Sequence, residues 1–249
     1  MLKEVSLIAA EDTRTTARLL ARYSIQTPLT SYHEHNRLSK LDAILAALAT
    51  GDVALVSDAG TPGLSDPGYE LICACIERGV TVVPLPGPSA LLPALVASGL
   101  PADSFLYLGF LPRKPGPRRA ALKAVAGLGY TLVFYEAPHR LIETLRDLFD
   151  VLGARPAVVA RELTKVHEEI WRGTLDEALA AFEQRPVRGE ITLVVGGAAL
   201  PPVAVWDESQ VRAALAARLA RGESRSAAAR AVSEESGWPR RDVYHLDGS

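Results

Sequence analysis

Short apolar runs alternate with longer helical patterns along most of the chain, and this alternation restricts the possible folds most strongly. The apolar runs predict strands at Val5–Ala10, Val53–Val56, Thr81–Val83, Phe105–Phe110, Thr131–Tyr135, Pro156–Ala160 and Ile191–Val195. The helical patterns lie at Thr15–Arg22, Leu38–Ala49, Tyr69–Arg78, Ala90–Ala97, Arg118–Ala126, Arg140–Phe149 and Leu175–Phe182. Several strand runs are apolar throughout, as expected for strands covered on both faces. The pattern therefore indicates an α/β protein with largely parallel sheets.

Two turn-rich stretches divide the 249-residue chain. One lies at residues 98–103 and the other ends with Pro201 and Pro202, so we expect an N-terminal α/β domain over 1–101 and a C-terminal α/β domain over 102–200. Residues 203–249 form a helical extension rich in Ala and Arg. Seven Arg and seven acidic residues follow Val205, so the extension is not a basic arm. Helical packing, dimerisation and a helix-turn-helix-like RNA contact all fit it.

The net charge of −2 excludes binding of nucleic acid by bulk electrostatics. A local basic patch remains at Arg113, Lys114, Arg118, Arg119 and Lys123, where it fits either a solvated loop or an RNA contact. No apolar run reaches the roughly 18–20 residues of a membrane helix. The acidic start does not resemble a signal peptide, so we expect a cytoplasmic protein without a membrane partner.

Metal chemistry is not indicated. His33 and His35 share a face of an extended segment, but no third ligand lies nearby in the sequence, so we expect no metal site. Cys73 and Cys75 are too close in sequence for an easy disulfide and resemble two buried small hydrophobic residues.

Two turns rich in Gly, Pro and Asp follow predicted strands. The first covers residues 57–68 and carries Asp58 and Asp66, which suit ribose hydroxyls or an amino group, or else simply cap the turns. The second begins with Pro84, and its residues Pro86, Gly87, Pro88 and Ser89 lead into a helix whose free N–H groups suit a carboxylate or ribose oxygen. Ligands of α/β proteins bind at such strand ends. Neither G-x-G-x-x-G nor a P-loop is present, which disfavours dehydrogenases and P-loop enzymes.

Eight segments occur in an order typical of one family: IAAEDTRTTARLL, SYHEHNR, VALVSDAGTPGLSDPGYELI, PLPGPSALLPAL, FLYLGFLPRK, TLVFYEAPHRL, ARELTKVHEEIWRGTL and GEITLVVGG. Together they resemble the ribosomal RNA small subunit methyltransferase I family of the tetrapyrrole-methylase superfamily. The resemblance covers nearly the whole chain, including SAAARAVSEESGWPRRDVY near its end.

The resemblance implies two α/β domains with S-adenosylmethionine in the cleft between them, and a homodimer. It implies 2′-O-ribose methylation of a cytidine in the decoding region of 16S ribosomal RNA, presented by the small ribosomal subunit. Together with the second turn, the motifs predict this cofactor-binding set: Asp58, Ala59, Gly60, Ser65, Asp66, Pro86, Gly87, Pro88, Ser89, Ala90, Tyr135, Glu136, Ala137, Arg161, Glu162, Leu163, Glu190, Ile191 and Thr192.

The catalytic candidates lie in three polar segments and are Arg14, Glu136, Arg140, Glu162 and Lys165. Any of them could position the ribose or a phosphate, and a Lys near a sulfonium could have a lowered pKa and act as a base. Each could instead belong to an ordinary ion pair, as the spacing of Glu162 and Lys165 allows.

Members of the family begin earlier, with a strand that leads into a T-P-I-G-N-L turn. We therefore expect this chain to lack one central strand and to expose a sheet edge. Two alternatives stay open: a non-catalytic ribosome-assembly or RNA-binding factor, and a small-molecule (tetrapyrrole or diphthine) methyltransferase of the same superfamily.

Overall fold

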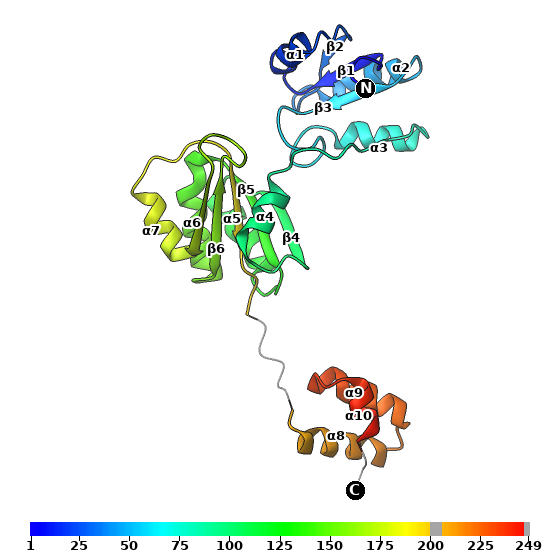
Figure 1. Ribbon diagram of the computed structural model, residues 1–249, viewed down its shortest axis with the longest axis vertical. Coiled ribbons are helices and arrows are strands. Elements are labelled where there is room, and N and C mark those ends of the chain that lie inside the picture. Colours follow the sequence, from blue (N-terminus) through cyan, green and yellow to red (C-terminus); the bar gives the residue numbers. More distant parts are fainter. Residues whose placement is uncertain (200–205, 247–249) are drawn as a thin grey trace. The chain divides into compact units, whose positions relative to one another are not determined.

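The computed structural model describes residues 1–199 and 206–246 (Figure 1). The chain forms two compact units, Met1–Gly197 and Ala198–Ser249. Within the described ranges, no helix is both long and apolar enough to cross a membrane.

The first unit begins with a three-stranded parallel sheet. Its strands are β1 (Leu7–Ala10), β2 (Leu29–Ser31) and β3 (Val53–Val56), in the order β2-β1-β3. The helices that follow them are α1 (Thr13–Arg22), α2 (Arg37–Leu48) and α3 (Tyr69–Glu77). Asp12 starts α1 because its carboxylate accepts a hydrogen bond from the Arg14 N–H. The small core of this region contains Ala9, Tyr32, Ile44, Leu71 and Cys75.

A five-stranded sheet completes the first unit. Its strands are β4 (Phe105–Phe110), β5 (Thr131–Glu136), β6 (Pro156–Arg161), β7 (Glu169–Thr174) and β8 (Ile191–Val195), in the order β4-β5-β8-β6-β7. Only β4 and β5 run parallel, and the other three pairs are antiparallel.

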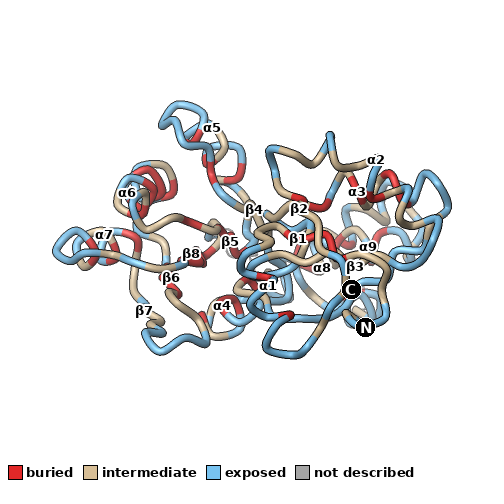
Figure 2. The backbone as a smooth tube through the Cα atoms, turned by 90° about the horizontal axis from the view of Figure 1, so that it is seen from above, coloured by how far each residue is buried: buried red, intermediate tan, exposed pale blue. Residues whose placement is uncertain are grey.

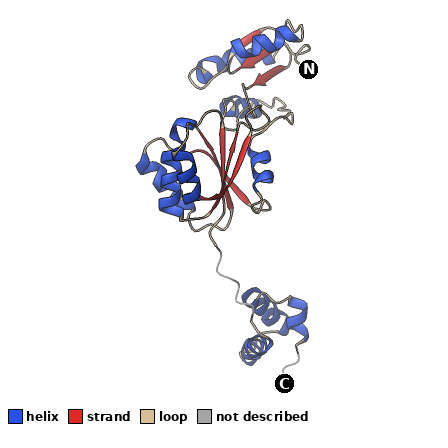
Figure 3. Cartoon of the chain, turned by 60° about the vertical axis from the view of Figure 1, so that its left-hand side comes forward, coloured by secondary structure: helices blue, strands red, loops and turns tan. Residues whose placement is uncertain are grey.

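Helices cover both faces of this sheet (Figure 3). One face carries α5 (Pro115–Val125), α6 (Leu141–Leu152) and α7 (Leu175–Glu183), and a short 3-10 helix, η1 (Pro138–Arg140), precedes α6. The other face is packed against α4 (Leu91–Ser98). Leu132 and Phe134 face the first group of helices, whereas Val133 faces α4. Burial therefore continues along β5 and β8, as Figure 2 shows.

The α/β fold class is confirmed, but four details differ from the sequence prediction. The second sheet is mixed rather than largely parallel, and residues 81–83 form no strand, since no described strand supplies a hydrogen-bonding partner there. Strands β2 and β7 were not predicted. The former is only three residues long, and the latter contains Glu169 and Gly173, residues that are uncommon in strands.

The basic patch also differs from expectation. Arg118 is buried, and its Nε lies 2.6 Å from Asp147 Oδ2 on α6, while Arg119 Nε lies 2.6 Å from the other oxygen of Asp147. The structure thus contradicts an RNA contact by Arg118, because α5 packs on α6 and uses this guanidinium inside the protein. Arg113, Lys114 and Lys123 remain exposed.

The second unit is helical, as predicted. It contains α8 (Glu208–Ala220), α9 (Arg225–Ser236) and α10 (Arg240–His245). Val211, Leu215 and Val232 form its core with Ala228, Ala229 and Val243. Trp238 Nε1 donates a hydrogen bond to the Trp206 carbonyl at 2.6 Å, which joins the segment before α8 to the turn before α10.

Candidate functional site

The ends of several strands meet around one cavity of about 680 Å³. In the five-stranded sheet β4, β5 and β6 run the same way, so their carboxyl ends lie at the edge where β7 and β8 begin. The cavity is lined by Ser57, Asp58, Ala59, Gly60, Leu64, Ser65, Asp66, Pro88, Ser89, Ala90, Pro93, Phe110, Tyr135, Glu136, Ala137, Pro138, Ala160, Leu163, Thr164, Lys165, Gly189, Glu190, Ile191 and Thr192.

The turn after β3 forms one wall of this cavity. Ser57 Oγ donates to the Ala59 carbonyl at 2.9 Å, and the Asp58 N–H donates to Glu11 Oε2 at 3.1 Å. The latter bond ties the turn to the end of β1. Ser65 has a positive φ of 61°, an unusual conformation for a residue other than glycine. Such backbone positions are found where surrounding structure determines them, often at binding sites.

Asp66 has the most perturbed carboxyl group in the cavity. Burial, followed by the nearby negative charges of Glu11, Asp58 and Glu190, raises the pKa of Asp66 from 3.8 to about 6. A hydrogen bond from Ser57 opposes these effects. The carboxyl groups that line the cavity thus repel one another, which favours a positively charged ligand.

Tyrosine side chains join this turn to the five-stranded sheet. The hydroxyl groups of Ser65 and Tyr107 lie 2.6 Å apart in a hydrogen bond. Burial raises the pKa of Tyr107 to about 12, so its hydroxyl stays protonated at neutral pH. The Tyr107 ring packs edge-on against Tyr135, with ring centroids 5.2 Å apart.

A turn after β6 supplies charged groups to another part of the wall. Lys165 Nζ lies 2.8 Å from Glu162 Oε1 and 3.3 Å from Glu190 Oε2. The hydrogen bond that Lys165 donates to Glu162, followed by the charge of Glu190, raises the pKa of Lys165. The direction of this shift is opposite to the lowering suggested for a catalytic lysine. Gly189 is needed here because a Cβ would come within 2.4 Å of the Glu162 side chain.

Glu136 and Arg140 lie at the end of β5 and are mostly buried. Glu136 Oε1 accepts a hydrogen bond from the Ala137 N–H at 2.7 Å, and Oε2 accepts one from Thr144 Oγ1. Arg140 Nε lies 3.3 Å from Glu136 Oε1 without hydrogen-bond geometry, and Nη2 donates to the Leu111 carbonyl at 2.7 Å. These contacts hold the segments around the cavity in place.

Most of the predicted cofactor set lines this one cavity. Pro86, Gly87, Arg161 and Glu162 do not line it, and neither do the catalytic candidates Arg14 and Arg140. Arg161 instead pairs with Glu169 across β6 and β7 at 3.1 Å. Arg14 is exposed and pairs with Asp12, which together with Asp58 raises its pKa.

Sequence reasoning did not single out eight lining residues: Ser57, Leu64, Pro93, Phe110, Pro138, Ala160, Thr164 and Gly189. Six of these residues adjoin predicted ones, so extending each motif by one position would have found Ser57, Leu64, Pro138, Ala160, Thr164 and Gly189. The side chain of Phe110 carries no such signal, because its direction depends on an irregularity in β4.

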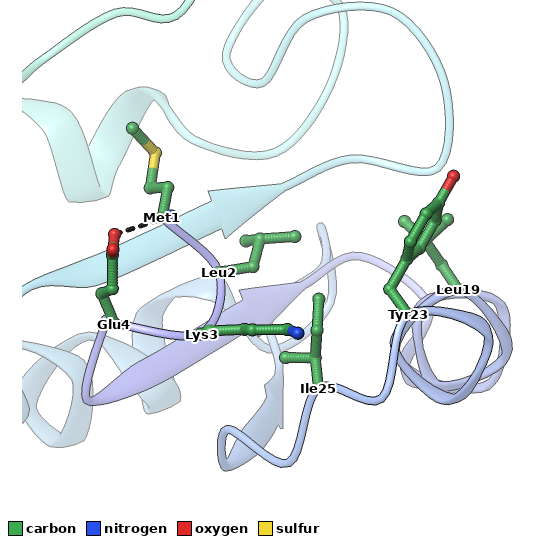
Figure 4. Close-up of a pocket in the computed structure, with 7 residues that line it drawn as sticks. All are labelled: Met1, Leu2, Lys3, Glu4, Leu19, Tyr23 and Ile25. Atoms are coloured by element: carbon green, nitrogen blue, oxygen red, sulfur yellow. Dashed lines mark ion pairs between the residues drawn. The ribbon is translucent and has the colours of Figure 1, made fainter.

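A second hollow of about 460 Å³ lies at the start of the chain (Figure 4). It is lined by Met1, Leu2, Lys3, Glu4, Leu19, Tyr23 and Ile25. The Met1 amino group pairs with Glu4 at 2.7 Å. The hollow holds no set of convergent polar groups, so the cavity around Asp66 is the candidate functional site.

Comparisons with known proteins define the class. The sequence profile of the tetrapyrrole (corrin/porphyrin) methylases matches residues 1–179. The cobalt precorrin-4 methyltransferase structure superposes with a TM-score of 0.58 at 16% identity, covering 78% of this chain and 85% of that one. A uroporphyrin-III C-methyltransferase from Thermus thermophilus, complexed with S-adenyl homocysteine, gives 0.53 at 21% identity, covering 78% and 87%. At these identities the likeness concerns the fold alone.

More similar relatives define the branch of this class. The ribosomal RNA small subunit methyltransferase I of Synechocystis sp. is 49% identical over 247 residues, which cover 98% of this chain and 88% of the relative. The protein of the same name from Bacillus subtilis is 42% identical over 248 residues, covering 98% and 85%. The chain therefore belongs to the ribosomal RNA small subunit methyltransferase I family of tetrapyrrole methylases.

Proposed function

We propose that this protein transfers a methyl group from S-adenosylmethionine to the ribose 2′-oxygen of a cytidine in the decoding region of 16S ribosomal RNA. The observation that carries the proposal is the convergence of the family motifs on one cavity. Residues 57–66, 88–90, 135–137 and 189–192 all contribute to its lining, although they are far apart in the sequence.

The cavity suits S-adenosylmethionine in size and charge. Its volume of about 680 Å³ lies within the range of small-molecule sites, roughly 300–1,000 Å³. Gly60 and Ala90 line the cavity, and residues this small let a ligand approach the backbone closely. Asp58, Asp66 and Glu190 supply negative charge for a cationic ligand. S-adenosylmethionine, when bound, supplies a methyl group carried on a positively charged sulfur.

Methylation of a ribose hydroxyl requires a group that removes its proton. We propose Asp66 for this role, because a carboxyl with a pKa of about 6 is mostly ionised at neutral pH yet binds a proton readily. Lys165 has a raised pKa and stays charged, so it holds a ribose or phosphate oxygen rather than acting as a base. Glu162 orients Lys165, and Glu136 and Arg140 hold the end of β5.

The RNA requires cations on the outside of the cavity. The side chains of Arg14, Arg113 and Lys114 are exposed, so they can reach phosphate groups. Among the described residues, the ion pair of Arg14 is the one with the neighbouring Asp12. The chain has a net charge of −2, so we do not expect bulk electrostatic attraction to hold free RNA on it. We therefore propose that the small ribosomal subunit, in the cytoplasm, presents the nucleotide to the cavity.

We also propose a homodimer. Helix α4 packs on the sheet with one side, while Leu92 and Val96 on its outer side are 53% and 77% exposed. Tyr69 and Ile76 on α3 are similarly exposed, as is Val83. Apolar faces of this kind are common in subunit interfaces. Val96→Asp should therefore shift the mass measured by light scattering from dimer to monomer, and a monomeric wild-type protein would refute this part.

Methyl transfer to small subunits from a strain that lacks the enzyme tests the main proposal. The RNA is digested to nucleosides, and mass analysis determines whether the label is on a ribose or on a base. We expect 2′-O-methylcytidine. Asp66→Asn should lower kcat at least about 100-fold, the lower end for a lost general base, with an intact fold.

Two outcomes would favour the alternatives. Label on a free tetrapyrrole, with none on RNA, would identify a small-molecule methyltransferase. Subunit binding without cofactor binding would identify an assembly factor. Isothermal titration with S-adenosylhomocysteine distinguishes an assembly factor from a methyltransferase, because only the methyltransferase binds this compound. Asp58→Ala should weaken the binding that this experiment measures.

A further inference from the structure

Strand β4 contains an irregularity that determines the direction of one side chain in the cavity. Tyr107 pairs with Val133 of β5, and Phe110 pairs with Tyr135. Between these two pairs β4 advances by three residues while β5 advances by two, so β4 contains one extra residue. Gly109 has a positive φ of 60° at this bulge. In a regular strand, Tyr107 and Phe110 would point to opposite faces. The bulge brings both onto the face of Tyr135.

The result is a group of three aromatic rings beside the cavity. Phe110 and Tyr107 both pack against Tyr135, with centroid distances of 5.7 and 5.2 Å. Tyr107 and Tyr135 are partly buried, whereas Phe110 lines the cavity and is 51% exposed. A supported aromatic ring with a free surface is the kind of group on which proteins stack unpaired bases.

The residues that follow Phe110 are held in place and carry positive charge. Arg140 Nη2 donates to the Leu111 carbonyl at 2.7 Å, and Arg118 Nη1 donates to the Arg113 carbonyl at 3.2 Å. The exposed side chains of Arg113 and Lys114 form no ion pair within the described part of the chain. An aromatic platform next to cations is the usual arrangement for binding a single nucleic-acid strand.

We propose that Phe110 is a stacking platform for the base of the acceptor nucleotide, with Arg113 and Lys114 on the adjoining phosphates. This inference rests on the proposed function and adds the contact that positions the substrate. The acceptor base fits better than the adenine of the cofactor for two reasons. Phe110 is the most exposed ring of the three. The acceptor strand also has phosphates on both sides of the base, which suit the two cations that follow Phe110, whereas S-adenosylmethionine contains no phosphate.

The test compares Phe110 variants in binding and in methyl transfer. Phe110→Ala should weaken binding to unmethylated small subunits, and raise KM for them, roughly 10- to 100-fold, the effect of losing one stacked base. Its affinity for S-adenosylhomocysteine should be unchanged. Phe110→Trp should stay within a few-fold of wild type. Phe110→Leu keeps an apolar side chain without a π face, so it should behave like Phe110→Ala.

Phe105→Ala is the matched control, because Phe105 is a partly exposed aromatic residue at the other end of β4 and outside the cavity. It should bind and methylate as wild type does. Unchanged subunit binding by Phe110→Ala would overturn the inference, and so would an equal loss of cofactor affinity or full activity of Phe110→Leu. The wild-type protein could bind subunits through Phe110 and yet transfer no methyl group. This result would contradict the proposed function but not the stacking role of Phe110.

Discussion

The three-stranded and five-stranded sheets consist of similar apolar strands but differ in burial. Every residue of β8 is buried, whereas every residue of β3 is only partly buried. Strand β8 lies between β5 and β6 with helices on both faces, while β3 lies at an edge of its sheet. The helices and strands that pack around an apolar strand thus decide how much it stabilises the protein. The cavity lies between a firmly packed sheet, which contains β8, and a less buried one, which contains β3.

The buried ion pair under α5 should show the largest difference between the two regions. Asp147→Ala removes the buried carboxylate 2.6 Å from Arg118 and leaves the guanidinium, among the described carboxylates, only the exposed Glu143 at 3.6 Å. The free energy of unfolding should therefore fall by about 3–5 kcal/mol. Glu70→Ala removes the partly exposed ion pair with Arg37 between α2 and α3. This variant should lower the free energy of unfolding by about 1 kcal/mol or less. Urea denaturation measures both. Arg118→Met combined with Asp147→Leu should recover most of the loss, and equal effects of the two single variants would remove the contrast.

A leucine from each sheet provides the next comparison. Leu193→Ala in β8 creates a cavity among buried neighbours and should cost about 2–5 kcal/mol of unfolding free energy. Leu55→Ala in β3 should cost clearly less, because that side chain is only partly buried. Thermal and urea unfolding measure the difference. A larger loss for Leu55→Ala would mean that the first sheet is better packed than its exposure indicates.

Asp66 should produce a smaller, pH-dependent effect. Its pKa in the folded protein, about 6, exceeds the usual 3.8, so folding favours the protonated form. The resulting stabilisation is present at low pH and is lost as the pH rises through about 6. Asp66→Asn should therefore raise Tm relative to wild type above that pH by about 2–4 °C, the shift that ~1 kcal/mol gives after allowance for solvent screening. The stabilisation is lost between pH 3.8 and about 6, so calorimetry at about pH 4 and about pH 7 compares the two ends of this interval. Asp103→Asn, at an exposed position, is the control. The same Tm difference at both pH values would exclude Asp66 as the titrating group.

The smallest effect should come from the exposed cations after β4. Arg113→Ala with Lys114→Ala removes two phosphate contacts, so the slope of log affinity against log salt should fall by about 1–2. Arg119→Ala is a suitable control because Arg119 already pairs with Asp147 and Asp150. Titration of labelled small subunits at several salt concentrations measures the slope. If Arg119→Ala flattens it as much, the phosphate contact lies on α5 instead.

Most of the fold was predictable because local patterns specify it. Each helix predicted between residues 15 and 182 is present, as are the strands at β1, β3, β4, β5, β6 and β8. Apolar runs of these lengths and helical spacing of apolar residues are local properties of a sequence. The predicted domain boundary near residue 101 stays a prediction. The other predicted boundary, between residues 200 and 203, lies outside the described residues, as do Pro201 and Pro202.

The candidate site was only partly predictable. The turns at residues 57–66 and 88–90 carry Gly, Pro and Asp, whose backbone preferences show in the sequence, and both line the cavity. Arg161 and Glu162 belong to the same family motif as Leu163 but do not line the cavity. A motif identifies a segment of chain, and the packing around it decides which of its side chains face the ligand.

The sequence alone determined the α/β class, the order of the family segments and the positions of the two polar turns, since each depends on residues close together in the chain. Tertiary structure alone decided that Arg118 is buried, that β7 pairs with β6, and that a bulge turns Phe110 toward Tyr135. The physical reason is common to all three. An ion pair, a strand ladder and a bulge each require a partner far away in the sequence, and no local pattern specifies that partner.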